Sequence, residues 1–370
     1  MRYFLCILAL LSCLGLPSCS DVAASKAAGN TGSPSIKASD YPSLQAAIDA
    51  IPKTGGTLVI DGQFEAAGQA CAHVTGEFGP CIYLRSNIRI MGDGVTSKIY
   101  TTDINGDALQ IIASDLITVS GVEFAGPWTP GTTGQNGVGV RIDMYAVHGG
   151  TPSTRVTVEH CQVHNFSFNG MWARNGNSQI HFLHNENYNN YWNAIEIEAQ
   201  DSSVLDNDLH DNGGQGIEIY STAQRLRVAN NRAHHNQVGI KLINDPTFGT
   251  LSAISVVGNE TSDNQTDGIV YQSLSPNDAP SGLITISGNT AINNLFDGIS
   301  LLHAGVGMTI SDNIASSNFS SDINISGGSD VVVSNNVMTA LPGGQHAANA
   351  IYISPQSSRI YVLNNSTYNF

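Results

Sequence analysis

The segment Val204–Ile219, VLDNDLHDNGGQGIEI, decides the fold because its pattern recurs along the chain. An apolar residue is followed three positions later by Asn, a second Asn comes five positions after the first, and Gly-Ile-x-Ile closes the unit. The same order returns in VVGNETSDNQTDGIV (256–270), ISGNTAINNLFDGISL (286–301) and ISDNIASSNFSSDINI (310–325). Self-similarity with a period of about 20 to 50 residues is typical of a solenoid.

Two columns of asparagine run through the repeats. The first contains Asn185, Asn207, Asn231, Asn259, Asn289, Asn313, Asn336 and Asn365, and the second contains Asn190, Asn212, Asn236, Asn264, Asn294 and Asn318. Asn tolerates the left-handed backbone conformation of a tight corner, and stacked side-chain amides can form hydrogen bonds along a column. We therefore expect these residues at the corners between strands. Cys161 takes the same place in an earlier repeat, so we interpret it as a structural residue.

Each unit contains two or three short runs of alternating apolar residues, and no run has the helical period. A strand this short cannot bury an apolar face alone, so we expect the units to stack as coils with parallel pairing and a continuous core of Ile, Val and Leu. The Gly-Ile-x-Ile segments recur at intervals of about 22 to 31 residues, which leaves loops of unequal length. The sequence therefore predicts one all-β solenoid domain of about eleven coils over residues 40–370.

The N-terminal end of the predicted solenoid carries a helical pattern. Leu44, Ala47, Ile48 and Ile51 are spaced as on one face of a helix, and GGTLVIDG (55–62) follows as a turn and a strand. An open solenoid end exposes strand edges, so we expect this helix to cap it. Helix, GGTLVIDG and Asn-cornered coils together resemble the pectin-lyase-like superfamily. The resemblance implies a right-handed parallel β-helix, and it leaves the activity open because that superfamily includes lyases, hydrolases, epimerases and proteins without known catalysis.

The first residues indicate export. MRYFLCILALLSCLGLPSC (1–19) has one Arg, an apolar run and then small residues, which is typical of a secretory signal peptide. LPSC resembles the bacterial lipobox, which implies lipidation of Cys19; ordinary cleavage nearby is the alternative. Residues 20–39 are rich in Ala, Ser, Gly and Lys and predict a flexible tether. We expect a lipoprotein at the bacterial outer membrane, in the periplasm or on the cell surface, or else a secreted protein.

Cysteine usage and charge narrow the partners. Cys71 and Cys81 bracket a short segment, and an exported location allows them to form a disulfide. The formal net charge of −15 argues against nucleic acid as a partner. We expect an extracellular polysaccharide partner, no membrane contact apart from a lipid anchor, and a monomer.

Charged residues make up 12% of the chain, yet several fall at equivalent positions of neighbouring coils. Strand alternation places the x residues of Gly-Ile-x-Ile on the outer face, about 4.8 Å from their equivalents on the next coil. Coil by coil these residues are Arg141 and Asp143, Trp172 and Arg174, Glu196 and Glu198, Glu218 and Tyr220, and Lys241 and Ile243. Stacked carboxylates repel unless a cation, a proton or a substrate group compensates. A site is one interpretation, and a solvated ladder of weak ion pairs is the other.

The first candidate chemistry is β-elimination of a uronic-acid polysaccharide. That reaction requires neutralisation of the sugar carboxylate, by Ca²⁺ on oxygen ligands or by Arg, and a base for the C5 proton. Glu196, Glu198 and Glu218 could hold Ca²⁺, Lys241 could be the base, and Arg174 or Arg141 could bind the uronate. The Glu-x-Glu pair resembles the calcium-binding pair of an alginate and dermatan lyase family of this fold, although the Lys that follows it in that family is absent here.

Two other readings remain open. Glu196 and Glu218 could be the carboxylate pair of a glycoside hydrolase, and Trp172 and Tyr220 could stack on sugars. The motifs of the polygalacturonase family and the Asp-Pro-His motif of alginate epimerases do not occur here. A glycan-binding scaffold without catalysis is the third reading. We predict an exported polysaccharide lyase, with hydrolase as the alternative. Its expected catalytic residues are Glu196, Glu218, Lys241 and Arg174, and its expected substrate-binding residues are Arg141, Asp143, Trp172 and Tyr220.

Overall fold

The computed structural model describes residues 33–66, 82–134, 136–143, 150–274, 282–303, 307–340 and 349–369. The expected signal peptide (1–19), the lipidation site Cys19, and Cys71 and Cys81 lie outside these residues. Pro34–Phe370 forms one compact unit. No helix in the described segments is long and apolar enough to cross a membrane.

Three parallel sheets make up this unit, and within the described residues they contain 13, 12 and 11 strands. Sheet A consists of β1 (Ser35–Lys37), β2 (Gly56–Val59), β5 (Ile88–Met91), β8 (Asp115–Ser120), β11 (Thr154–Glu159), β14 (Ser178–Leu183), β17 (Ser203–Leu205), β20 (Gln224–Ala229), β23 (Ser252–Val257), β26 (Gly282–Ser287), β29 (Met308–Ser311), β32 (Ser329–Ser334) and β35 (Ser358–Leu363). Sheet B consists of β3 (Gln63–Glu65), β6 (Lys98–Tyr100), β9 (Glu123–Ala125), β12 (Gln162–His164), β15 (Glu186–Tyr188), β18 (Asp208–His210), β21 (Arg232–His234), β24 (Glu260–Ser262), β27 (Thr290–Ile292), β30 (Ile314–Ser316), β33 (Val337–Thr339) and β36 (Ser366–Tyr368). Sheet C consists of β4 (Ile82–Leu84), β7 (Leu109–Ile112), β10 (Val140–Asp143), β13 (Met171–Ala173), β16 (Ile195–Ile197), β19 (Gln215–Tyr220), β22 (Val238–Asn244), β25 (Ile269–Ser273), β28 (Ile299–Leu302), β31 (Ser321–Ser326) and β34 (Asn349–Ile353).

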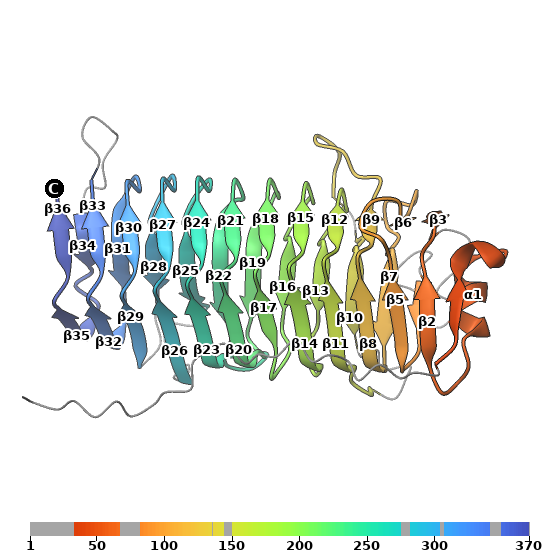
Figure 1. The fold of residues 1–370 in the computed structure, drawn as a ribbon. Coiled ribbons are helices and arrows are strands. Elements are labelled where there is room, and N and C mark those ends of the chain that lie inside the picture. The colour runs from red at the N-terminus through yellow and green to blue at the C-terminus, as the bar shows by residue number, and fades with distance from the viewer. Residues whose placement is uncertain are drawn as a thin grey trace, which may run out of the picture. The chain divides into compact units, whose positions relative to one another are not determined.

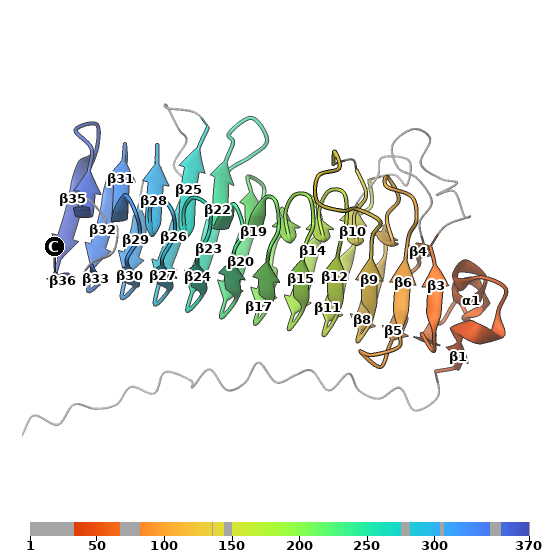
Figure 2. The same ribbon diagram turned by 90° about the horizontal axis from the view of Figure 1, so that it is seen from above.

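The chain winds through sheets C, A and B in turn, so each full coil adds one strand to each sheet (Figures 1 and 2). This is the predicted all-β, right-handed parallel solenoid. The composition predicted a tether over residues 20–39, but β1 already pairs with β2 through Ser35 and Thr57. The folded unit therefore begins inside that segment, because Ile36 packs against the apolar core.

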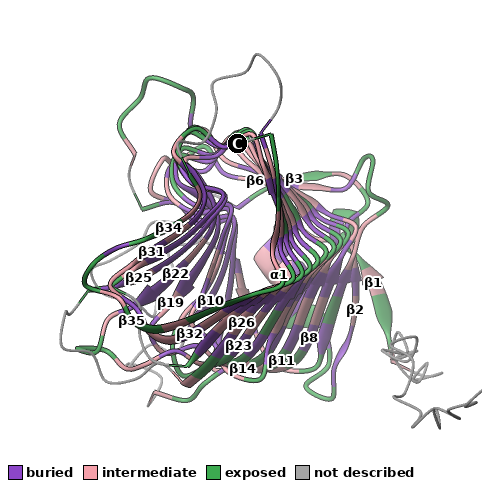
Figure 3. Ribbon diagram, turned by 90° about the vertical axis from the view of Figure 1, so that its left-hand side faces the viewer, coloured by how far each residue is buried: buried purple, intermediate pink, exposed green. Residues whose placement is uncertain are grey.

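The inward side chains form one continuous core. In Figure 3, which views the ribbon along the axis, the buried residues of the sheets are purple. The apolar residue that opens each Gly-Ile-x-Ile segment is fully buried in coil after coil, as in Ile195, Ile217, Ile240, Ile269 and Ile299. Glycine precedes four of these five residues, and Ala194 precedes Ile195. A Cβ on Gly239 would lie 2.5 Å from the carbonyl oxygen of Gly268 on the next coil, so that position requires glycine. The repeat motif thus combines an apolar residue for the core with a glycine for close approach of coils.

The asparagine columns are buried hydrogen-bond ladders, as predicted. The main-chain N–H and the Nδ2 of Asn231 both donate to Oδ1 of Asn259, each at 2.9 Å, and Asn259 repeats the pattern toward Asn289. Cys161 stands at the start of the first column, where its N–H donates to Asn185, and burial raises the pKa of its thiol to about 12. The expected left-handed conformation falls one residue earlier, for example at Asn230, since the ladder side chain itself must point inward.

Helix α1 (Leu44–Ala50) precedes β2, with Ser43 accepting a hydrogen bond from the N–H of Ala46 at its start. Leu44, Ala47 and Ile48 of this helix are buried. The capping role of α1 stays a prediction. The buried side chains of the helix extend the apolar core beyond the first strands.

Candidate functional site

The outer face of sheet C carries the predicted column of polar residues. The strand register joins Arg141, Trp172, Glu196, Glu218 and Lys241 as direct neighbours on five consecutive strands. The register predicted from the repeat is therefore confirmed. The column lies on regular strands, so the backbone holds each side chain about one strand spacing from the next.

Glu196 and Glu218 form the centre of this column, and one asparagine holds both. Nδ2 of Asn193 donates to Oε2 of Glu218 and, at 3.3 Å, to Oε2 of Glu196. A second amide, Nδ2 of Asn169, donates to the same Oε2 of Glu196 at 2.7 Å. Glu218 is buried, and Glu196 is partly exposed. The two carboxyl groups are thus held side by side on the outer face of sheet C.

Burial, together with the charges of Glu218 and Glu198, raises the pKa of Glu196 to about 8, against the hydrogen bonds from Asn169 and Asn193, which lower it. Burial also raises the pKa of Glu218, against the opposing effects of the Asn193 hydrogen bond and the Lys241 charge. At neutral pH the pair therefore retains a proton. A protonated carboxyl beside a carboxylate is an arrangement suited to acid–base catalysis.

Glu198 and Arg174 belong to a separate group around Trp172. The indole Nε1 donates to Oε1 of Glu198 at 3.2 Å, and the Arg174 guanidinium lies 5.0 Å from the centre of the indole ring. Arg174 also pairs with the buried carboxylate of Asp143 at 3.1 Å. Arg174 thus forms its ion pair with an acidic residue of the preceding coil.

Arg141 departs from its expected role in substrate binding. Its side chain is fully buried, with Nε 2.6 Å from Oδ2 of Asp107, which is also fully buried. Nη2 donates to Oδ1 of Asp107 and to the carbonyl of Asn136, each at 3.0 Å. The guanidinium lies 4.8 Å from the ring centre of Trp172. Arg141 is therefore a structural support beneath Trp172, since a buried ion pair leaves no surface for a sugar carboxylate.

Replacing Arg141 by Met should lower the free energy of unfolding by about 3 kcal/mol, because Asp107 would remain as an uncompensated buried charge. Thermal unfolding measures the change. Arg225→Met is the matched control, since Arg225 pairs with Asp201 on the exposed surface and that pair contributes little. Equal midpoints for the two variants would contradict the structural role of Arg141.

Lys241 follows Glu218 in the column, and within the described residues it forms no ion pair shorter than 4.0 Å. Its positive charge opposes the rise in pKa of two neighbouring carboxyl groups, those of Glu218 and Asp267. Burial, followed by the charge of Asp297, raises the pKa of Asp267 to about 7. Lys241 thus lies near two acidic groups, Glu218 and Asp267, and forms an ion pair with neither of them.

Tyr220 lies on β19 beyond Glu218 and donates a hydrogen bond from its hydroxyl to Oδ2 of Asp245 at 3.2 Å. Burial and the Asp245 carboxylate raise the pKa of this phenol to about 12. Its ring lies 6.2 Å from that of Phe248, an exposed residue on the loop after β22. The two rings form an aromatic edge beside the carboxylate pair.

The three glutamates proposed as calcium ligands do not converge. Glu196 and Glu218 share Asn193, whereas Glu198 is held by Trp172. Among the described residues, no group of three or more His, Cys, Asp or Glu side chains is arranged to hold a metal ion. The expected ligand set therefore does not fit Ca²⁺, which takes six to eight oxygen ligands.

The residues two positions before the first apolar residue of each Gly-Ile-x-Ile segment were not among the predicted site residues. This second column includes Asn169, Asn193, Gln215, Asp267 and Asp297. Asn169 and Asn193 hold the glutamates, and Asp297 accepts a hydrogen bond from Nδ2 of Asn324 at 2.6 Å. The repeat contained part of the signal, because this position is an amide in three coils, Val238 in the next, and an acid in the two after that.

A family model described as the right-handed beta helix region matches residues 86–252. The chain is a right-handed parallel β-helix protein. The fold that the resemblance to the pectin-lyase-like superfamily implied, a right-handed parallel β-helix, is confirmed.

Several solved structures are similar to this β-helix protein. The A-module of the mannuronan C-5 epimerase AlgE4 from Azotobacter vinelandii is 16% identical, with 91% of this chain and 98% of that chain covered and a TM-score of 0.64. A periplasmic alginate epimerase, AlgG, is 15% identical, with 90% and 83% covered and a TM-score of 0.60. A tailspike protein mutant of E. coli bacteriophage HK620, in complex with a pentasaccharide, is 13% identical, with 88% and 62% covered and a TM-score of 0.64. At these identities the similarity shows the fold alone. No curated protein sequence matches this β-helix protein.

Proposed function

We propose that this protein binds and cleaves a polysaccharide along the outer face of sheet C, with Glu196 and Glu218 as the reacting carboxyl groups. The observation that carries the proposal is the shared amide of Asn193, which fixes two stacked carboxyls of raised pKa beside each other. Perturbed carboxyl pairs on an open face are typical of catalytic sites. An ion-pair ladder would instead lower these pKa values.

Hydrolysis is the chemistry that the pair supports best. Glu196 carries the proton and acts as the general acid toward the glycosidic oxygen. Glu218 carries the charge and acts as the nucleophile or as the base for water. Asn169 and Asn193 orient both groups before the substrate arrives, which is the kind of preorganisation that accelerates such a step. Trp172 and Tyr220 border the pair and supply surfaces for sugar rings.

The structural neighbours support a polysaccharide substrate. They include a mannuronan C-5 epimerase, a periplasmic alginate epimerase and a tailspike with bound pentasaccharide. The use of this fold on glycans by epimerases and by a tailspike supports a polymer substrate on the long outer face. The same neighbours, with the signal-like residues 1–19, support export to the periplasm or the cell surface. Lipidation of Cys19, a disulfide between Cys71 and Cys81, and a monomeric state complete this proposal.

Elimination on a uronic-acid glycan is the second candidate, and Lys241 favours it. A lysine that is not committed to an ion pair, one strand spacing from Glu218, can serve as the base for a C5 proton. Arg174 keeps 39% of its side chain exposed and can contact a uronate. Two supports for elimination are weaker than the sequence suggested, because Arg141 is buried and the calcium ligands do not converge.

Incubation of the protein with a panel of neutral and uronic-acid polysaccharides tests the proposal. We expect new reducing ends without ultraviolet absorption from unsaturated sugars, whereas such absorption would show elimination instead. Glu218→Gln should lower the rate at least about a hundredfold. Lys241→Ala should do so only if elimination is the chemistry. Glu260→Gln, an exposed carboxylate on sheet B, is the matched control and should leave the rate unchanged.

Addition of a chelator to the same assay tests calcium dependence, and we expect no loss of rate, since the three glutamates do not converge. A protein that neither binds nor cleaves any glycan of the panel would overturn the proposed function and leave the scaffold interpretation. Cleavage that persists in both Glu218→Gln and Glu196→Gln would place the reaction elsewhere on the molecule.

A further inference from the structure

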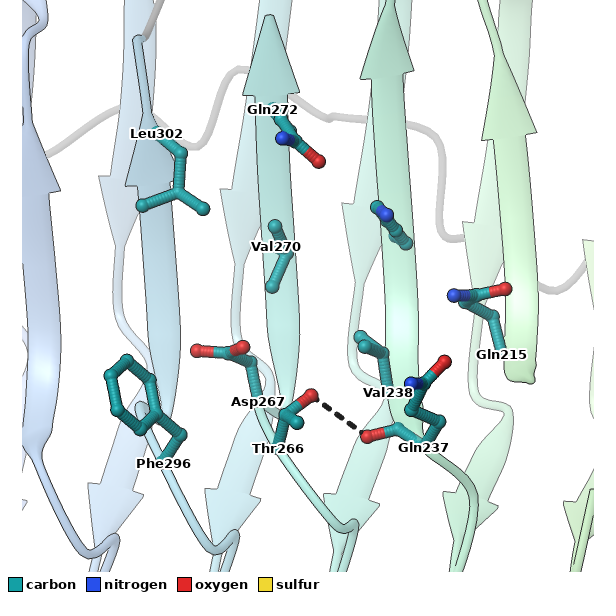
Figure 4. A pocket seen from close by; sticks show the side chains of 10 residues that line it. Gln215, Gln237, Val238, Thr266, Asp267, Val270, Gln272, Phe296 and Leu302 are labelled. Atoms are coloured by element: carbon teal, nitrogen blue, oxygen red, sulfur yellow. Dashed lines mark hydrogen bonds between the residues drawn. The ribbon is translucent and has the colours of Figure 1, made fainter. Parts of the chain in front are cut away.

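A hollow of about 370 Å³ lies on the outer face of sheet C, directly after Lys241 (Figure 4). Its volume falls within the range of about 300–1,000 Å³ that is usual for small-molecule sites. Residues of four consecutive coils line it: Gln215, Gln237, Val238, Lys241, Thr266, Asp267, Val270, Gln272, Phe296 and Leu302. Because Lys241 is the strand neighbour of Glu218, the hollow adjoins the carboxylate pair on its C-terminal side.

The floor of the hollow is apolar. Val270 takes the column position that Glu196 and Glu218 occupy on earlier coils, and Leu302 follows one coil later at the second outward position. Val238 and Val270 are 7% and 3% exposed, so little of each reaches the surface. Phe296, at 48% exposed, stands at the rim. The outer face therefore changes from charged to apolar two coils after Glu218.

Polar groups surround this apolar floor, and one of them lacks a partner. Gln215 is 4% exposed, and its Oε1 forms no hydrogen bond with any described residue. A buried carbonyl oxygen of this kind costs stability unless a ligand or water donates to it. Figure 4 shows Gln215, Gln237 and Asp267 around the hollow, and the hydroxyl of Thr266 is already held by the carbonyl of Gln237 at 2.9 Å.

We infer that this hollow is the subsite for a methyl-bearing sugar, a 6-deoxyhexose or an acetylated sugar, in the unit next to the scissile bond. The inference deepens the proposed function and rests on it. A methyl group would cover Val270 and Leu302, the ring would contact Phe296, and a sugar hydroxyl would donate to Asp267. A hydroxyl in place of the methyl would have to lie against the apolar floor without a hydrogen-bond partner, which is unfavourable.

Binding of simple sugars to the intact protein tests the inference without requiring catalysis. The probes are two matched pairs, methyl fucoside with methyl galactoside and N-acetylglucosamine with glucose, so that the deoxy and acetyl sources are separated. Discrimination by one methyl group in an apolar pocket is about tenfold or more. We expect that preference in at least one pair by NMR titration. Saturation transfer should be strongest at the methyl protons.

Two variants locate the binding. Phe296→Ala should weaken binding of the preferred probe about fivefold, and Asp267→Asn should weaken it as well. Leu295→Ala is the matched control, because Leu295 is 63% exposed and does not line the hollow. Equal binding within both pairs, or a preference unchanged in both variants, would overturn the inference. Preferred binding in the hollow without cleavage of any polysaccharide would overturn the proposed cleavage and leave only the sugar preference of the hollow.

Discussion

Glu196→Gln is expected to lower kcat on the cleaved polysaccharide by about a thousandfold or more, with a much smaller change in KM. The substitution keeps the size and the hydrogen bonds from Asn169 and Asn193, and it removes the proton that Glu196 delivers. General acid catalysis by a positioned side chain contributes about 10² to 10⁴ in rate. Steady-state kinetics with the polysaccharide identified in the panel measures the effect.

The pH profile separates this role from a structural one. Because Glu196 acts in its protonated form and its pKa is about 8, wild-type activity should decline as the pH rises through 8. The residual activity of Glu196→Gln should lack this alkaline decline. A variant that keeps the decline would assign it to another group, and a variant with wild-type kcat would remove Glu196 from the reaction.

The same substitution should stabilise the folded protein at alkaline pH. The pKa of Glu196 is raised from about 4.5 to about 8 on folding, so between these values the folded state binds more protons than the unfolded state. The free energy of unfolding therefore falls as the pH rises through this window. Glu196→Gln removes that loss, and we expect a gain of about 1–3 kcal/mol at pH 9 and none at pH 4. Thermal midpoints across this pH range, with Glu260→Gln as the control, measure it.

The register of the outer face could be predicted from sequence because the solenoid is periodic. Once Ile195, Ile217 and Ile240 are placed in the core, strand alternation puts Glu196, Glu218 and Lys241 on one outward line. Each coil lies on its neighbour through parallel pairing, so one correct offset fixes all the others. This is why residues more than twenty positions apart could be brought together without a structure.

Side-chain partners could not be predicted in the same way. Arg141 occupies an outward position on β10, yet its side chain is buried in an ion pair with Asp107. Asp107 comes just before β7, the strand that pairs with β10. Whether an outward side chain meets water or another side chain depends on rotamers and on loops of unequal length. Glu198 illustrates the same point, because its rotamer makes it an acceptor for Trp172 and not a partner of the other two glutamates.

The hollow after Lys241 was missed for a different reason. Val270 and Leu302 give no signal of a site in the sequence, because a single outward apolar residue is common on protein surfaces. Their meaning depends on Phe296 and Gln215, which come from corners and from other coils. A site that is defined by concavity requires the positions of loops, and the repeat pattern carries little information on those.

Asn259→Ala is expected to destabilise the protein by about 3–6 kcal/mol, which is the largest loss of stability that we predict for a single substitution. Oδ1 of Asn259 accepts from both the N–H and the Nδ2 of Asn231, and its own Nδ2 donates to the carbonyl of Val228 at 3.0 Å. Asn259 is 1% exposed, so water cannot replace these bonds. A loss of this size corresponds to a fall in the thermal midpoint of roughly 10 °C.

Asn365→Ala is the matched control for this prediction. Asn365 makes the same three contacts, accepting from the N–H and Nδ2 of Asn336 and donating to the carbonyl of Val333, each at 2.9 Å. It ends the described ladder and is partly exposed, so water can take over the bonds that alanine removes. We therefore expect the midpoint of Asn365→Ala to fall by less than half as much. Equal falls would show that the ladder acts through local corner geometry, and no fall for Asn259→Ala would show that core packing alone holds the coils in register.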